Sequence, residues 1–171
     1  GDWSSDVCSS DLLDPRKGAK TKLNSIHQTL RELGKTLRDE VGFSIQIRCP
    51  DSSVAQDTQA NLESFINQYG FTSAPRPRMI RIEAEINQRF VKKEKVANRV
   101  ELVHAAQGKL RVLEADGSEV QALTFVLSPR GYTEQSQNGR EAKKAALRLG
   151  GDTVVSKFRV ICRKAFQRED P

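Results

Sequence analysis

The stretch that decides the fold is Leu110-Arg-Val-Leu-Glu-Ala-Asp-Gly-Ser-Glu-Val-Gln-Ala-Leu-Thr-Phe-Val-Leu127. Two apolar runs, Leu110–Leu113 and Val120–Leu127, flank the segment Glu114-Ala-Asp-Gly117. An Asp-Gly pair between such runs is a strong turn signal, because glycine adopts the positive φ angles that tight hairpin turns need. The stretch therefore predicts an antiparallel β-hairpin.

Further strands are predicted on both sides of this hairpin. Phe43, Ile45 and Ile47 alternate with polar residues, and so do the apolar residues from Ile80 to Ile86, which indicates two half-buried strands. The segment 88–108 is ambiguous between helix and strand, and we favour a strand over about 98–105. Apolar and polar residues alternate after Gly150-Gly151, which predicts a final strand over Thr153–Phe166.

Three helices complete the pattern. The first spans about Lys20–Glu40, the second runs from Val54 to Gly70, and the third covers Arg140–Leu149 and ends at Gly150-Gly151. The order predicts an α+β fold: a mostly antiparallel sheet of about five or six strands, with about three helices packed on one face.

Residues 1–12 resemble a translated sequencing adapter, so we expect them not to be structural. Without Asp2, Asp6 and Asp11 the net charge rises from +6 to +9. Residues 13–171 then form a single α+β domain. Within it we expect a helix-strand-helix part at 20–70, a proline linker at 72–78 and a sheet-rich part at 79–171.

Several classes of function are excluded by the residues. No apolar run is long enough to span a bilayer, so we expect no membrane partner. Cys49 and Cys162 are predicted to be free thiols in a cytoplasmic protein. We predict no metal site, no cofactor and no catalytic residues, and we lean against an enzyme.

Basic clusters carry the functional prediction. On the predicted final strand Lys157, Arg159 and Arg163 would form a row of cations able to follow a phosphate backbone. The sequence therefore predicts a non-enzymatic DNA- or RNA-binding protein, for which an accessory factor of a bacterial or phage mobile element is one candidate. The nucleic-acid-binding residues would be Arg76, Arg78, Lys92, Lys93, Lys95, Arg130, Tyr132, Arg140, Lys143, Lys144, Arg148, Lys157, Arg159 and Arg163.

Two alternatives remain open. Leu23, Ile26, Leu30, Leu33 and Leu37 form one helical stripe, which we expect first of all to face the protein core. Alternatively, the stripe could join two copies of the chain or bind a partner helix, which would make the protein an assembly module.

The remote alternative is a small metal-dependent nuclease. It would use Glu83 and Glu85, which share one strand face, or a pattern made of Pro50-Asp51 and Glu141-Ala-Lys143.

Overall fold

The computed structural model describes residues 15–133 and 139–167. The chain divides into two compact units, Gly1–Glu40 and Val41–Pro171. The described part of the first unit is one long helix, α2 (Pro15–Glu40). Proline at the first helical position is favourable, because its missing N–H has no partner there in any case.

The second unit is built on a five-stranded sheet. Its strands are β1 (Val41–Arg48), β2 (Arg78–Val96), β3 (Arg99–Leu113), β4 (Glu119–Val126) and β5 (Arg130–Thr133). The order across the sheet is β1-β2-β3-β4, and β5 pairs with the N-terminal part of β3. β1 runs parallel to β2, whereas the remaining pairs are antiparallel.

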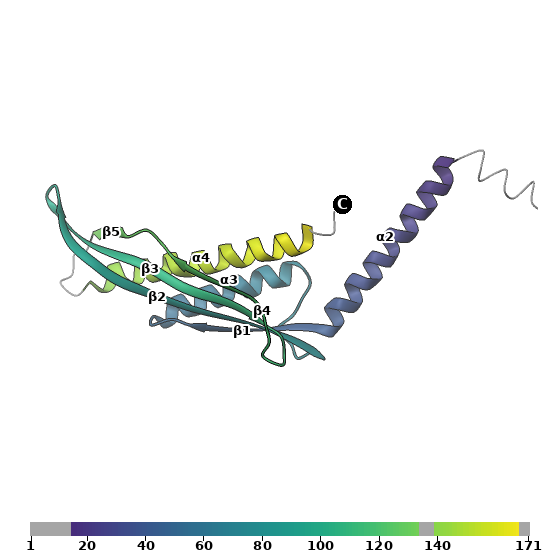
Figure 1. The fold of residues 1–171 in the computed structure, drawn as a ribbon, viewed down its shortest axis with the longest axis horizontal. Helices are drawn as coiled ribbons and strands as arrows, with labels where there is room; N and C mark the ends of the chain where they lie inside the picture. The colour runs from purple at the N-terminus through teal and green to yellow at the C-terminus, as the bar shows by residue number, and fades with distance from the viewer. Residues whose placement is uncertain (1–14, 134–138, 168–171) are drawn as a thin grey trace, which may run out of the picture. The chain divides into compact units, whose positions relative to one another are not determined.

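Two helices cover one face of this sheet, as Figure 1 shows. α3 (Ser52–Gln68) connects the parallel strands β1 and β2, and α4 (Arg140–Gln167) follows β5. Side chains from both helices and from the central strands form the core, among them Leu62, Ile82, Ile86, Leu110 and Val154. The predicted α+β class, with helices on one face of a mostly antiparallel sheet, is confirmed.

The β3–β4 hairpin also agrees with its sequence pattern. Gly117 has φ 86°, a left-handed conformation in which a Cβ would be strained. The backbone N–H of Gly117 donates to the carbonyl of Glu114, and the N–H of Glu114 donates to that of Ser118, each at 2.9 Å. The ambiguous segment 88–108 is resolved as the second half of β2, a turn at Ala97, and most of β3.

The predicted final strand is wrong, because residues 153–166 belong to the continuous helix α4. Val154, Val155 and Phe158 are buried, and Ile161 and Cys162 are half-buried, which is a helical spacing. Gly150 and Gly151 do not stop the helix. They are buried inside it, where α4 packs against Ile86 of the sheet and Thr58 of α3.

Candidate interaction surfaces

The largest run of exposed apolar side chains lies on α2. Leu23, Ile26, Leu30, Leu33 and Leu37 are each between 52 and 56% exposed. Scattered exposed apolar residues are ordinary on protein surfaces, but a continuous row of five on one helix marks an interaction surface. We call these five residues the α2 stripe.

The α2 stripe has the spacing of a coiled-coil seam. Its steps of three and four residues place Leu23, Leu30 and Leu37 at a positions of a heptad, and Ile26 and Leu33 at d positions. The flanking e and g positions hold no apolar residue that would widen the stripe. They are Lys20, Lys22, His27, Thr29, Gly34 and Thr36. A seam of this width suits one facing helix better than the broad surface of a globular core or a lipid interface.

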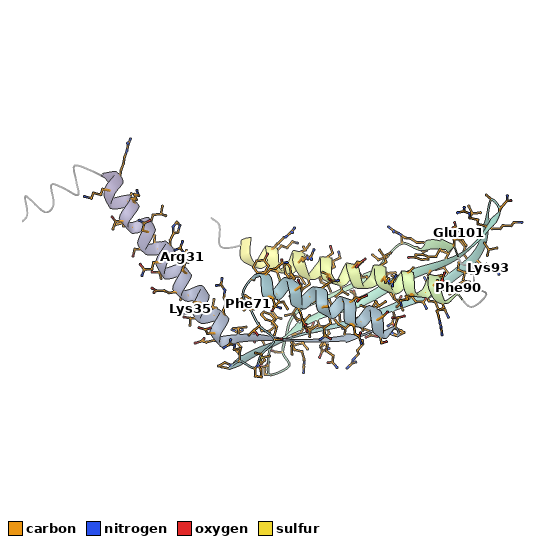
Figure 2. All side chains as sticks on the ribbon, turned by 180° about the vertical axis from the view of Figure 1, so that it is seen from behind. Arg31, Lys35, Phe71, Phe90, Lys93 and Glu101 are labelled. Atoms are coloured by element: carbon orange, nitrogen blue, oxygen red, sulfur yellow. The ribbon has the colours of Figure 1, made fainter. Side chains whose placement is uncertain are left out.

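Charge is distributed unevenly along α2. Arg16, Lys17, Lys20 and Lys22 form a basic N-terminal part, and the first turn holds no acidic residue. The C-terminal part is mixed, ending in Arg38, Asp39 and Glu40. Figure 2 shows Arg31 and Lys35 projecting from this helix. Cations near a helix N-terminus meet the positive end of the macrodipole, which is unfavourable unless another group compensates.

The basic residues of the second unit do not form the predicted row. On α4, Arg159 and Arg163 are four residues apart and share one side of the helix, whereas Lys157 lies on another. The Arg159 guanidinium lies 5.5 Å from the centre of the Phe65 ring, a cation–π geometry.

The remaining predicted basic residues are spread over several elements of the second unit. Arg78 forms an ion pair with Glu114 and lowers the pKa of that carboxyl through its hydrogen bond. Figure 2 shows Lys93 and Phe90 towards the β2–β3 turn, at the other end of the sheet from Phe71. The others lie on that same hairpin end, in the loop before β2, on β5 and on the first half of α4: Arg76, Lys92, Lys95, Arg130, Arg140, Lys143, Lys144 and Arg148. Tyr132, the one aromatic residue among the predicted nucleic-acid-binding residues, lies in β5 opposite Leu102 and is half-buried.

The carboxylates considered for a nuclease have structural partners. Glu83 is paired with Arg81 at 3.0 Å and with Arg111 at 3.5 Å across the open face of the sheet. Asp51 caps α3, and Glu85 accepts a hydrogen bond from Asn87. Within residues 15–133 and 139–167 there is no group of three His, Cys, Asp or Glu side chains arranged to hold a metal ion.

Cys49 and Cys162 are free thiols in the structure. Burial raises the pKa of Cys162 to about 11, and burial also raises the pKa of Cys49. His104 is buried on β3, where its Nδ1 lies 2.5 Å from the Gln88 Oε1 and its ring packs edge-on to Phe90. These contacts place His104 in the packing of the hairpin.

One surface was missed by the sequence reasoning. Val120–Leu127 was expected only as half of a hairpin, yet β4 lies at the edge of the sheet. Its exposed apolar residues include Val120 and Val126, at 58 and 71% exposure. The run from Val120 to Leu127 contains no charged residue, but this pattern does not distinguish an edge strand from a buried central strand.

In the part of the chain that the structure describes, no helix combines the length and the apolar character needed to cross a membrane.

Comparison with known proteins gave matches only among solved structures. No family model and no curated protein matches this chain. A minor lipoprotein from Acinetobacter baumannii is similar with a TM-score of 0.49 and 11% identity, over 75% of this chain and 96% of that one. The rare lipoprotein B from Shewanella oneidensis is similar with a TM-score of 0.42 and 12% identity, over 76% of this chain and 96% of that one.

Lipoproteins from Nitrosomonas europaea and Neisseria meningitidis are among the other matches. The predictions of a nucleic-acid-binding function, of DNA or RNA as partner and of a cytoplasmic location are contradicted by these matches to bacterial lipoproteins. With TM-scores below 0.5, the likenesses assign no function of their own to this chain.

Proposed function

We propose that this protein is a non-enzymatic assembly module, and that α2 pairs with α2 of a second copy through the α2 stripe. The observation that carries the proposal is the row of five leucine and isoleucine side chains, each more than half exposed, at coiled-coil spacing. Most helical stability in proteins comes from packing an apolar face, which α2 would gain from a facing helix.

A second copy is the occupant that the charges of α2 favour, in an antiparallel arrangement. Setting Ile26 of each copy opposite Leu30 of the other also sets Leu23 opposite Leu33, and Leu37 opposite Ala19. Every large residue of the stripe then meets an apolar partner in the seam. Antiparallel pairing also opposes the two helix macrodipoles favourably.

The end layers of this alignment are complementary. Arg16 of each copy lies opposite Glu40 of the other, at both ends of the paired helices. A parallel, in-register pair would instead place Arg16 opposite Arg16 and Glu40 opposite Glu40. Because like charges disfavour such layers, the antiparallel pair is the better one.

The test is the mass of the full chain in solution as a function of concentration, by sedimentation equilibrium. We expect Leu30→Gln/Leu33→Gln to weaken association at least tenfold, because two seam side chains per copy become polar. Glutamine keeps a helix propensity close to that of leucine, so far-UV circular dichroism should report a folded protein.

The matched control places the same residue type on the outer face of α2. Arg31→Gln/Lys35→Gln should leave the association constant within about twofold of the unmodified chain. If Leu30→Gln/Leu33→Gln and this control have equal effects in folded protein, the seam is not the interface and the proposal fails.

A further inference from the structure

The end of the β2–β3 hairpin carries a second group of exposed apolar side chains. Phe90, Val91, Val96 and Val100 are between 36 and 52% exposed. Figure 1 shows that the turn joining β2 and β3 projects past the start of α4. Neighbouring exposed apolar side chains at a projecting end indicate an interaction surface. The same segment is rich in cations, which are Arg89, Lys92, Lys93, Lys95 and Arg99.

The register of the two strands sorts these side chains onto two faces. Residues directly opposite each other in antiparallel strands share a face. Three such pairs follow one another along β3 in steps of two residues, so that all six side chains lie on one face. They are Phe90 with His104, Lys93 with Leu102, and Lys95 with Val100. The irregularity between Phe90 and Lys92 is what brings Lys93, instead of Lys92, onto the face of Phe90.

This face is on the side of the sheet that the helices cover. The Leu102 Cδ1 lies 3.0 Å from the position of a Cβ on Gly139, the residue that precedes α4. The neighbouring strand β5 adds two side chains to the same face, because Arg130 lies opposite His104 and Tyr132 lies opposite Leu102. We define the hairpin face as Phe90, Lys93, Lys95, Val100, Arg130 and Tyr132.

The carboxylates of the hairpin lie on the other face. Glu94 and Glu101 are directly opposite each other there, and Glu94 also forms an ion pair with Lys92 at 2.6 Å. Within residues 88–106 and β5, the hairpin face holds no carboxylate. Its cations Lys93 and Lys95 are exposed. Figure 2 shows Phe90 and Lys93 at this end of the molecule. The hairpin face therefore combines apolar and basic groups without an acidic one.

This composition favours a lipid surface over a protein partner. Lysine is depleted in the cores of protein–protein interfaces. Segments that lie at a bilayer surface instead combine lysine or arginine with aromatic and aliphatic side chains. The stem of a lysine then lies along apolar surface while its ammonium group reaches the headgroups. Anionic headgroups supply the negative charge that the hairpin face lacks.

We infer that the hairpin face binds the surface of a lipid bilayer that contains anionic lipids. Phe90 and Val100 enter the boundary between headgroups and acyl chains, and Lys93, Lys95 and Arg130 contact lipid phosphates. Such a contact needs no spanning segment. It therefore differs from the sequence-based expectation of no membrane partner, which depended on the length of apolar runs. The inference is independent of the proposed α2 pairing, because the hairpin face belongs to the second unit.

The test is cosedimentation of the full chain with lipid vesicles. One set contains equal parts of phosphatidylcholine and phosphatidylglycerol, and the other contains phosphatidylcholine alone. All proteins carry Leu30→Gln/Leu33→Gln, which removes the α2 seam, so that α2 pairing does not raise the affinity by presenting two hairpin faces at once. We expect binding to the anionic vesicles, weaker binding to the neutral ones, and a decrease with added salt.

The basic part of the hairpin face is tested by Lys93→Gln/Lys95→Gln. Loss of two lysines near an anionic surface should weaken vesicle binding about 25-fold. The matched control is Lys157→Gln/Lys164→Gln, which removes the same charge from exposed positions of α4. This control should bind within about twofold of the parent protein, because charges away from the bilayer are screened at physiological salt.

The apolar part is tested by Phe90→Thr/Val100→Thr. It should weaken binding at least about tenfold, because two apolar side chains no longer enter the bilayer surface. Threonine keeps a high β propensity, so circular dichroism should report a folded protein. The control is Val96→Thr, since Val96 is 46% exposed but lies opposite Arg99 on the other face. It should bind within about twofold of the parent protein.

Three outcomes would overturn the inference. The first is a parent protein that binds anionic vesicles no better than neutral ones. The second is an equal loss of binding in the two lysine-to-glutamine variants, which would show that net charge alone attracts the chain. The third is a folded Phe90→Thr/Val100→Thr variant that binds as tightly as its parent. Each would leave the α2 proposal standing, because that proposal is judged by the mass of the chain without vesicles.

Discussion

The Cγ2 methyl of Ile86 lies 2.7 Å from the position that a Cβ atom on Gly150 would occupy. The neighbouring Gly151 is similarly close to the Thr58 hydroxyl of α3. The glycine pair therefore lets α4 approach both the sheet and α3. These contacts join the two helices to one core and fix the second unit as a single packed body.

Gly150→Ala should destabilise the protein, although alanine is normally favoured over glycine in a helix by about 1 kcal/mol. The added methyl overlaps Ile86, and overpacking of a core costs about 1–3 kcal/mol. We expect a net loss of up to about 2 kcal/mol in the free energy of unfolding, measured by urea denaturation. Ile86→Leu removes the Cγ2 branch and should reduce the effect of Gly150→Ala. Gly18→Ala, where the space around the Cβ is open, should instead raise helix content.

Asp51 is expected to hold the start of α3. Its carboxylate accepts hydrogen bonds from the Ser53 hydroxyl at 2.6 Å, the Ser53 N–H at 3.0 Å and the Val54 N–H at 3.1 Å. The hydrogen bond from the Ser53 side chain is the main reason that the pKa of Asp51 is lowered. Asp51→Ala should lower the melting temperature, whereas Asp51→Asn should retain most of the cap.

The pH dependence of this cap has a definite sign. Because folding lowers the pKa of Asp51, the stabilisation is complete above the unfolded pKa and is lost as pH falls through the folded value. The difference in melting temperature between the unmodified chain and Asp51→Ala should therefore shrink in acid. A difference that grows as pH falls would contradict the assigned role.

Cys162 should react slowly with alkylating reagents in the folded protein. Burial raises the pKa of its thiol from 9.0 to about 11, so the thiolate near neutral pH is reduced about 100-fold. Mass spectrometry after iodoacetamide treatment should show slow labelling, which accelerates in urea. Since folding raises this pKa, the folded state should also lose stability as pH rises from 9 towards 11. Equal labelling rates with and without urea would show that the thiol is accessible and ordinary.

The sequence predicted those elements whose signals are local. The β3–β4 hairpin follows from Asp116-Gly117 between apolar runs, and the α2 stripe from steps of three and four residues. The last strand was mispredicted because Gly150-Gly151 is typical of a helix end and because basic and apolar residues alternate from Lys157 to Val160. At these two positions glycine allows α4 to lie close to Ile86 and Thr58, which are distant in sequence.

The candidate surfaces divide in the same way. For the α2 stripe the sequence favoured a core-facing helix and left an exposed seam as the alternative, because both place apolar residues at steps of three and four. The position of β4 at the edge of the sheet could not be predicted from the sequence, because the strand order depends on where β5 and the helices pack. A run without charge from Val120 to Leu127 fits a buried central strand equally well.

The direction of the α2 pair can be tested through Arg16 and Glu40. In the antiparallel pair, Arg16→Glu places like charges opposite Glu40 of the other copy at both ends. Exposed ion pairs are worth up to about 1 kcal/mol each, so the dissociation constant of the α2 pair should rise roughly three- to tenfold. The measurement is sedimentation equilibrium of the full chain at low salt.

The double variant Arg16→Glu/Glu40→Arg should restore the original association constant, because each end layer again joins opposite charges. A parallel pair behaves differently: Arg16→Glu only exchanges one like-charged layer for another, and the double variant brings no rescue. Added salt should reduce the difference between the single and double variants, since exposed pairs are screened. Weakening without rescue would contradict the antiparallel register even if α2 pairs with a second copy, because the two substitutions would then act on separate layers.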